Sequence, residues 1–237
     1  MKHVFFDLDK TLWDHEMNLY AALRRLFEQF RDEMPGISLE NFSGLFIPIN
    51  ESLWQRFSQG KISGPHLRFL RFRLCLQQLG ISSNNLARRM SRTFMEIAPR
   101  GTALESGAME VLERLGRHYR LHIITNGLED SQLTKLRYAG IYPLFSSITT
   151  SDRCGFRKPD PRIFRHAFRR SGATPAEAAF VGDDWGIDVE PALALGFKYT
   201  VWYNPKNKER PRPVSDNFME IRHLSELTTA LIPAQMP

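Results

Sequence analysis

Short apolar runs recur along the chain, and each is followed by small or polar residues. The first begins at His3 and ends in Asp-Leu-Asp. Runs of this length, bounded by turn residues, are typical of strands buried on both faces of a parallel sheet. The sequence therefore predicts six strands, the last at a sheet edge, at residues 3–8, 121–124, 148–150, 178–181, 199–203 and 218–221.

Amphipathic segments alternate with these runs. They predict helices at residues 104–115, 128–138, 161–170, 187–195 and 224–231. Alternating strands and helices imply right-handed crossovers that place helices on both faces of the sheet. The predicted fold class is therefore α/β, a doubly wound, Rossmann-like parallel sheet.

One interval is too long for a single crossover, because more than a hundred residues separate Asp7 from Thr125. Within it, residues 15–98 contain amphipathic patterns but no strand pattern. These patterns predict a helical bundle with helices at 19–30, 39–57, 67–79 and 86–97. We expect a catalytic core of residues 1–14 and 99–237, with an inserted helical domain at 15–98, where Pro99 and Gly101 mark the exit.

Composition excludes several classes of protein. A hydrophobic content of 42% argues against disorder, and two cysteines cannot build a disulfide framework. The first residues turn acidic too early for a signal peptide, and no apolar run reaches the ~18 residues of a membrane helix. We expect a cytoplasmic protein that does not contact membranes. Its net charge of +6 suits either nucleic-acid binding or phosphorylated substrates.

Polar residues follow the predicted strands. In an open parallel sheet, ligands bind at the carboxyl ends of the strands. The residues near those ends are Asp7, Asp9, Thr11, Thr125, Asn126, Lys158, Asp183 and Asp188. Four converging acids are costly unless a cation offsets their repulsion. Oxygen ligands without His or Cys indicate a hard ion, most simply Mg2+.

Such a site suits phosphoryl transfer. One carboxylate can act as nucleophile and form an aspartyl-phosphate, while a second protonates the leaving oxygen and then activates water. A lysine can neutralise the nucleophile and the phosphate, and Thr and Asn donors can hold the phosphoryl oxygens. The metal neutralises phosphate charge and aligns the group.

Four motifs carry a family resemblance. They are Asp7-Leu8-Asp9-Lys10-Thr11, Thr125-Asn126-Gly127, Lys158-Pro159, and Gly182-Asp183 with Asp188. In this order and strand context they resemble the haloacid dehalogenase-like superfamily, and the resemblance spans nearly the whole chain. It implies that the helical insert is a mobile cap that closes over small substrates.

The resemblance also implies roles for the acids. Asp7 would be the nucleophile and a Mg2+ ligand, and Asp183 a further ligand. Asp9 would be the general acid/base, with its backbone carbonyl also touching the metal. Dehalogenases of the superfamily lack an acid at the position of Asp9, so the resemblance favours a phosphatase.

The remaining motif residues would support the reaction. By the same resemblance, Thr125 and Asn126 would bind the transferring phosphoryl group, and Lys158 would steady Asp7 and the phosphate. Asp188 would support the metal or orient Lys158, and Thr11 would order the loop.

Softer features resemble the noncanonical pyrimidine 5'-nucleotidase branch. They are residues 6–14 and the stretch 53–63 of the predicted cap. This branch implies nucleoside 5'-monophosphates as substrates. Trp13, Lys61 and Arg68 are candidate substrate contacts. The histidines, His15 among them, show no metal-ligand spacing and are assigned to surface or packing roles.

Alternatives remain open at this point. The enzyme could act on phosphoglycolate or a sugar phosphate, or be a phosphomutase. A catalytically idle regulatory homologue is a third alternative. An alternative of another class is a basic nucleic-acid-binding module, but the sequence contains no zinc site, helix-turn-helix pattern or RNA-binding aromatic motif to support it. We expect the partner to be a small phosphorylated metabolite rather than a nucleic-acid polymer, and the protein to be a monomer or weak homodimer.

Overall fold

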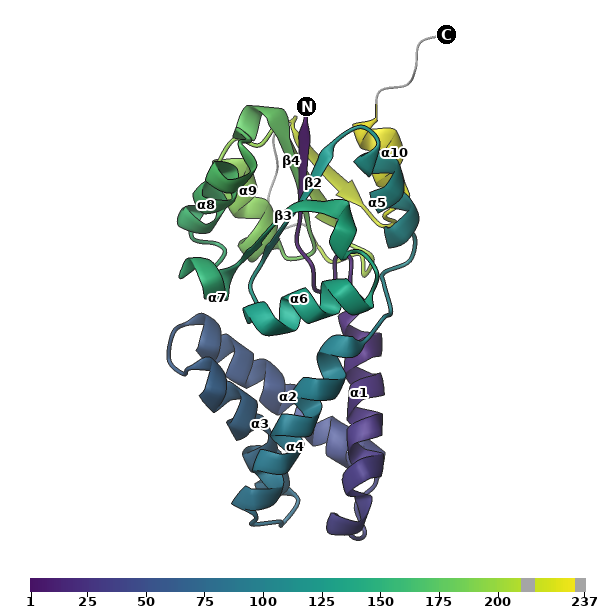
Figure 1. Ribbon diagram of the computed structural model, residues 1–237, viewed down its shortest axis with the longest axis vertical. Coiled ribbons are helices and arrows are strands. Elements are labelled where there is room, and N and C mark those ends of the chain that lie inside the picture. Colours follow the sequence, from purple (N-terminus) through teal and green to yellow (C-terminus); the bar gives the residue numbers. More distant parts are fainter. Residues whose placement is uncertain (210–215, 233–237) are drawn as a thin grey trace. The chain divides into compact units, whose positions relative to one another are not determined.

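A single parallel sheet organises the larger part of the chain in the computed structural model, which describes residues 1–209 and 216–232. The strand order is β3-β2-β1-β4-β5-β6, and every neighbouring pair is parallel (Figure 1). The strands are β1 (His3–Phe6), β2 (Arg120–Thr125), β3 (Phe145–Thr150), β4 (Ala178–Gly182), β5 (Tyr199–Tyr203) and β6 (Phe218–Ile221). The predicted α/β class is confirmed, and β6 lies at an edge as expected.

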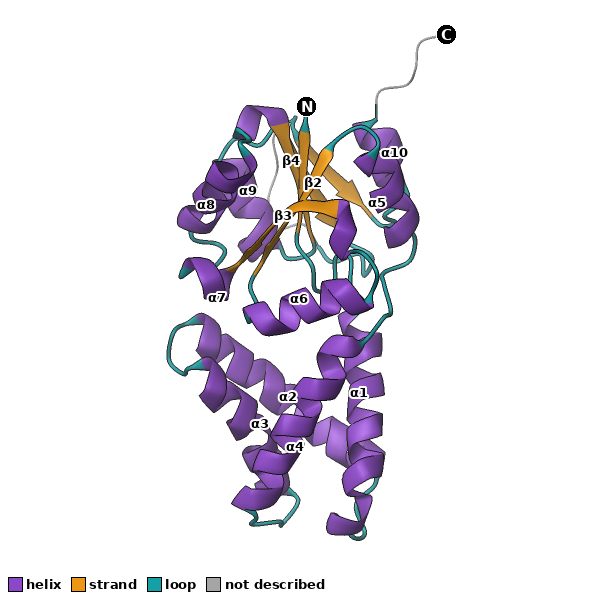
Figure 2. Ribbon diagram, in the orientation of Figure 1, coloured by secondary structure: helices purple, strands orange, loops and turns teal. Residues whose placement is uncertain are grey.

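Helices cover both faces of this sheet (Figure 2). Val4 and Phe6 of β1 join an apolar cluster on one face, while Phe5, between them, joins the cluster on the other. The first face is covered by α5 (Ala108–Gly116), α6 (Glu129–Tyr138) and α10 (Glu226–Leu231). The second is covered by α8 (Pro161–Ser171) and α9 (Glu190–Ala194). Burying one such side chain contributes about 2 kcal/mol.

In the sheet unit, two predicted helices differ most from the observed ones, and in the insertion the first helix begins at His15 rather than at residue 19. The helix expected at 104–115 begins only at Ala108, because Gly107 has a left-handed backbone (φ 79°) that ends the preceding loop. The helix expected at 187–195 consists of a π-helical turn, η5 (Trp185–Val189), followed by α9. The first strand ends at Phe6, so Asp7 lies in the loop. A short helix, α7 (Ser151–Cys154), was not predicted.

The chain leaves and re-enters the sheet unit through paired segments. Trp13 and Leu104 form an antiparallel bridge. On either side of it, the Glu105 amide donates to the Leu12 carbonyl (2.9 Å) and the Asp14 amide to the Ala103 carbonyl (3.1 Å). The two ends of the insertion are therefore held together within the sheet unit.

The chain divides into two compact units, residues 1–15 with 102–237, and residues 16–101. The second is helical and comprises most of α1 (His15–Phe30), then α2 (Leu39–Ser58), α3 (Gly64–Gln78) and α4 (Asn84–Ile97). Ser38, Ser63 and Ser83 cap the last three helices by accepting backbone N–H bonds. Its core is aromatic, with Phe42, Phe46, Phe72 and Phe94 all buried.

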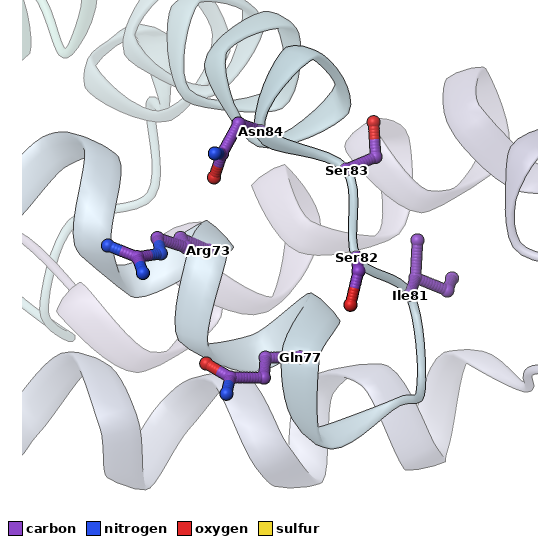
Figure 3. A pocket seen from close by; sticks show the side chains of 6 residues that line it. All are labelled: Arg73, Gln77, Ile81, Ser82, Ser83 and Asn84. Atoms are coloured by element: carbon purple, nitrogen blue, oxygen red, sulfur yellow. The ribbon is translucent and has the colours of Figure 1, made fainter.

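The helical unit also has a surface hollow of about 210 Å³ between the end of α3 and the start of α4 (Figure 3). Its lining residues are Arg73, Gln77, Ile81, Ser82, Ser83 and Asn84. None of these is a predicted site residue, and the role of the unit as a cap remains a prediction. Among the described residues, no helix combines the length and apolar character needed to cross a membrane.

Candidate active site

The predicted site residues meet at the carboxyl ends of three adjacent strands. Asp7 follows β1, Thr125 ends β2, and Asp183 follows Gly182 at the end of β4. Because β2, β1 and β4 are neighbours, parallel and in register, their ends reach the same edge of the sheet. The topology therefore places residues that are more than a hundred positions apart beside one another.

Lys158 is the buried cation of the site. Its ammonium nitrogen lies 2.6 Å from Asp7 Oδ1 and 2.5 Å from Asp188 Oδ1, and its side chain is only 1% exposed. Burial alone would lower the pKa of Lys158, but Asp188 and Asp7 raise it above its usual value. Lys158 is therefore charged and holds together a carboxylate of the loop after β1 and one of η5.

Three carboxylates gather at the same place. Oxygens of Asp7, Asp183 and Asp188 lie within 4.8 Å of one another. Burial raises the pKa of Asp7 to about 7 despite Lys158. Burial, with the charges of Asp7 and Asp188, raises the pKa of Asp183 to about 8.

Besides burial, these shifts reflect a lack of positive charge, since Lys158 alone does not balance three clustered acids, two of which are buried. An all-oxygen donor set of this kind fits Mg2+, the ion predicted from the sequence. The Asp9 side chain is not part of this cluster.

The close approach of Asp188 depends on Gly182. A Cβ atom at Gly182 would lie 2.5 Å from the Asp188 side chain. Asp188 is further fixed by the Asp184 amide, which donates to its Oδ2 atom at 3.2 Å. The glycine of the fourth motif thus leaves the space that lets Asp188 reach Lys158.

Asn126 contacts the backbone of Lys158. Its side-chain amide donates to the Lys158 carbonyl and its oxygen accepts from the Lys158 amide, both at 2.8 Å. This pair of bonds ties the end of β2 to the loop that carries the lysine. Asn126 therefore positions Lys158 in this structure, in addition to its predicted role in phosphoryl binding.

Asp9 lies among polar groups that sequence reasoning did not identify. Its Oδ1 atom lies 2.5 Å from Lys135 Nζ and 3.4 Å from His15 Nδ1, while its Oδ2 atom accepts from Gln132 Nε2 at 2.9 Å. Although burial opposes it, Lys135 and His15 lower the pKa of Asp9. The His15 ring packs against Trp13, as a packing role implies, and its additional contact with Asp9 was not predicted.

Gln132 and Lys135 stand one turn apart on α6, shortly after the second motif. That spacing puts them on one helix face, which was the available signal. Neither belongs to a motif, and both contact a residue more than 120 positions away.

The other candidates lie around or away from this cluster. The Thr11 hydroxyl is buried and reaches Asp7 Oδ2 at 3.5 Å, which suits a loop-ordering role. Trp13 is 2% exposed within the sheet's apolar cluster, and its ring lies 4.3 Å from Lys135 Nζ. Packing accounts for Trp13 here. Lys61 and Arg68 belong to the helical unit, at the turn after α2 and on α3, and their contact with substrate remains a prediction.

Sequence comparison supplies independent evidence. Residues 1–196 match the haloacid dehalogenase-like hydrolase family. The chain is 31% identical to HAD-hydrolase YfnB of Bacillus subtilis over 227 residues, which cover 94% of this chain and 92% of YfnB. It is 28% identical to the pyrimidine 5'-nucleotidase PynA of Streptococcus pneumoniae, covering 88% and 86% of the two chains. Identity to the pyrimidine 5'-nucleotidase YjjG of Escherichia coli is 25%, with 96% of each chain covered.

Structure comparison agrees. The magnesium-bound crystal structure of YfnB superposes with a TM-score of 0.82 at 28% identity, covering 97% of this chain and 98% of that one. The match extends over both units of the chain, and the four motifs lie where the fold brings their side chains together. This chain therefore belongs to the haloacid dehalogenase-like hydrolases and is an enzyme of that family.

Proposed function

We propose that the protein is a Mg2+-dependent phosphatase that hydrolyses small phosphomonoesters through an aspartyl-phosphate on Asp7. The observation that carries the proposal is the buried contact of Lys158 with both Asp7 and Asp188, beside Asp183. Lys158 orients one Asp7 oxygen, so the other can face a phosphorus atom. The presence of Asp9 supports phosphoryl transfer rather than dehalogenation.

The metal would be held by Asp7 and Asp183, and Asp188 would support them by orienting Lys158. Bound there, Mg2+ supplies the positive charge that the phosphate and these acids require. The raised pKa values of Asp7 and Asp183 support this assignment, because both carboxyls lack sufficient positive charge in the protein alone.

The chain's own groups account for two chemical steps. In the first, an Asp7 oxygen forms a bond to phosphorus as the bond from phosphorus to the leaving oxygen breaks, and that oxygen takes a proton from Asp9. In the second, water attacks phosphorus, Asp9 takes a proton from it, and the Asp7–phosphorus bond breaks to release phosphate. Thr125 and Lys158 hold the phosphoryl oxygens throughout.

The surroundings of Asp9 favour the second step in the free enzyme. Lys135 and His15 stabilise its carboxylate, which is the form that accepts a proton from water. A bound phosphate brings negative charge close to Asp9, and this opposes the effect of the two cations and favours the protonated form. Substrate binding therefore assists the proton transfer of the first step.

For the substrate, we infer nucleoside 5'-monophosphates, pyrimidine ones in particular. Two relatives that match over most of their length bear the name pyrimidine 5'-nucleotidase, and residues 6–14 resemble that branch. The test is phosphate release from nucleotides, sugar phosphates and phosphoglycolate, with Mg2+ and with a chelator. Pyrimidine monophosphates among the poorest substrates would contradict the substrate assignment, and undiminished activity in the chelator would contradict the metal assignment.

The nucleophile has its own test. We expect Asp7→Asn to lower phosphate release by at least about a thousandfold, because an amide cannot form the acyl-phosphate. Asp32→Asn, the same change at an exposed acid in the helical unit, is the matched control and should leave the rate unchanged. Full activity of folded Asp7→Asn would overturn the mechanism. Substrate turnover without free phosphate would indicate a mutase instead.

A further inference from the structure

Gln132 is a buried polar residue of α6 that belongs to none of the four motifs. It is 1% exposed, and its Nε2 atom lies 2.9 Å from Asp9 Oδ2 and 2.6 Å from Thr125 Oγ1. We propose that Gln132 is a positioning residue that fixes the acid/base carboxylate and the phosphate-binding hydroxyl relative to each other. This inference rests on the proposed phosphatase function and deepens it.

The orientation of the Gln132 amide follows from its partners. A carboxylate only accepts hydrogen bonds, so the amide nitrogen must face Asp9. The same nitrogen carries two hydrogens and therefore also donates to the Thr125 oxygen. Because Thr125 accepts this bond, its own hydroxyl hydrogen remains available to donate to a phosphoryl oxygen. Gln132 thereby sets the direction in which Thr125 donates.

The two oxygens of Asp9 are held from different sides. Gln132 donates to Oδ2, whereas Lys135 and His15 contact Oδ1. A carboxylate oxygen has two lone pairs, so the two contacts of Oδ1 use both of its lone pairs, whereas Oδ2 keeps one that Gln132 does not use. The carboxylate is thus fixed in orientation but still able to exchange a proton.

The remaining atom of Gln132 argues against a packing role. Its Oε1 atom is buried, and no described residue hydrogen-bonds to it. A buried acceptor without a partner destabilises a fold, so an apolar side chain of the same length would serve packing better. A Cβ atom at Gly127 would lie 2.5 Å from the Gln132 side chain, so the glycine of the second motif leaves room for this residue.

The test is Gln132→Met, which keeps the length but removes both donors and the unpartnered oxygen. Two esters are compared, 4-nitrophenyl phosphate, whose leaving group needs little protonation, and uridine 5'-monophosphate, whose alkoxide needs a general acid. We expect kcat for the nucleotide to fall by about tenfold or more beyond any fall for the nitrophenyl ester. The urea midpoint should be unchanged or higher.

Two further variants make the outcome specific. In an Asp9→Asn background, Gln132→Met should no longer change the ratio of the two rates, because the residue acts through Asp9. Gln78→Met, the same change at an exposed glutamine of α3, is the matched control and should leave both rates unchanged.

The inference is overturned if Gln132→Met leaves the rate ratio unchanged, or lowers both rates equally together with stability. If the wild type releases phosphate from both esters, those outcomes leave the proposed function standing. Release from neither ester would overturn the proposed function and this inference with it.

Discussion

At the scale of single residues, the site depends on close approaches that only glycine permits. Gly182 lies against the side chain of Asp188, and Gly127 lies against that of Gln132. In both cases an added Cβ atom would come too close to the neighbouring side chain. Neither glycine has a left-handed backbone, so it is space rather than conformation that requires them. Two motif glycines are thereby explained by packing against residues of the site.

Gly182→Ala should displace Asp188 and weaken its contact with Lys158. We expect phosphate release to fall by about tenfold or more, since a shift of the order of an ångström is enough for such losses. The control is Gly44→Ala in the exposed part of α2, where an added Cβ meets nothing within 4 Å. That change should raise the free energy of unfolding by up to about 1 kcal/mol. Unchanged kinetics in Gly182→Ala would contradict the role given to Asp188.

At the scale of elements, a buried polar chain crosses three strands away from the site residues. His3 Nδ1 of β1 lies 2.9 Å from His122 Nε2 of β2, and His122 Nδ1 lies 2.8 Å from Ser147 Oγ of β3. Burial, with the charges of His3 and Arg120, lowers the pKa of His122 to about 4. The ring is therefore neutral in the fold at pH values where an unfolded histidine is already protonated.

This difference predicts a loss of stability in acid. Between pH about 6.5 and about 4 the unfolded chain binds a proton at His122 that the folded chain does not, so acid favours unfolding. The free energy of unfolding should fall by up to about 3 kcal/mol over this range from this group. Urea titrations at several pH values measure it. His122→Gln should flatten the dependence, whereas His118→Gln, at an exposed position, should not.

Elements whose pattern is local were predictable from sequence. The bounds of β5 and β6 agree with the predicted runs, because each run ends at turn residues, and β5 is buried along nearly all of its length. The start of α5 could not be predicted from the sequence, because Leu104 pairs with Trp13 across the insertion instead of joining the helix. Contacts of this kind leave no local pattern.

The same reasoning applies to the site. Its motif residues were predictable because parallel strands bring their carboxyl ends together, and this topology follows from the alternation of elements. The surroundings of Asp9 could not be predicted from the sequence. Gln132 and Lys135 sit 123 and 126 residues from it in sequence, and only the packing of α6 brings them close.

At the scale of the whole molecule, a basic protein surrounds an acidic site. The net charge is +6, although three acids, two of them buried, cluster at the strand ends. An excess of positive charge at the surface attracts anions over a distance set by the ionic strength. We infer that it favours the approach of phosphorylated substrates.

The expected signature is a salt-dependent kcat/KM. Raising the salt from about 0.01 M to about 0.15 M shortens the Debye length from about 30 Å to about 8 Å. We expect kcat/KM for a nucleoside monophosphate to fall several-fold, mainly through KM, while kcat changes little. Initial rates at fixed Mg2+ measure this. A kcat/KM that does not vary with salt would show that surface charge plays no part in substrate capture.

The paired segments around Trp13 and Leu104 have an evolutionary consequence. The bridge joins both ends of the insertion inside the sheet unit. The strand before Asp7 and the strand that ends in Thr125 can therefore keep their register whatever lies between residues 15 and 102. An inserted unit can then lengthen, shorten or be replaced without rebuilding the chemistry. The paired segments thus make the helical unit exchangeable while the residues of the reaction stay in place.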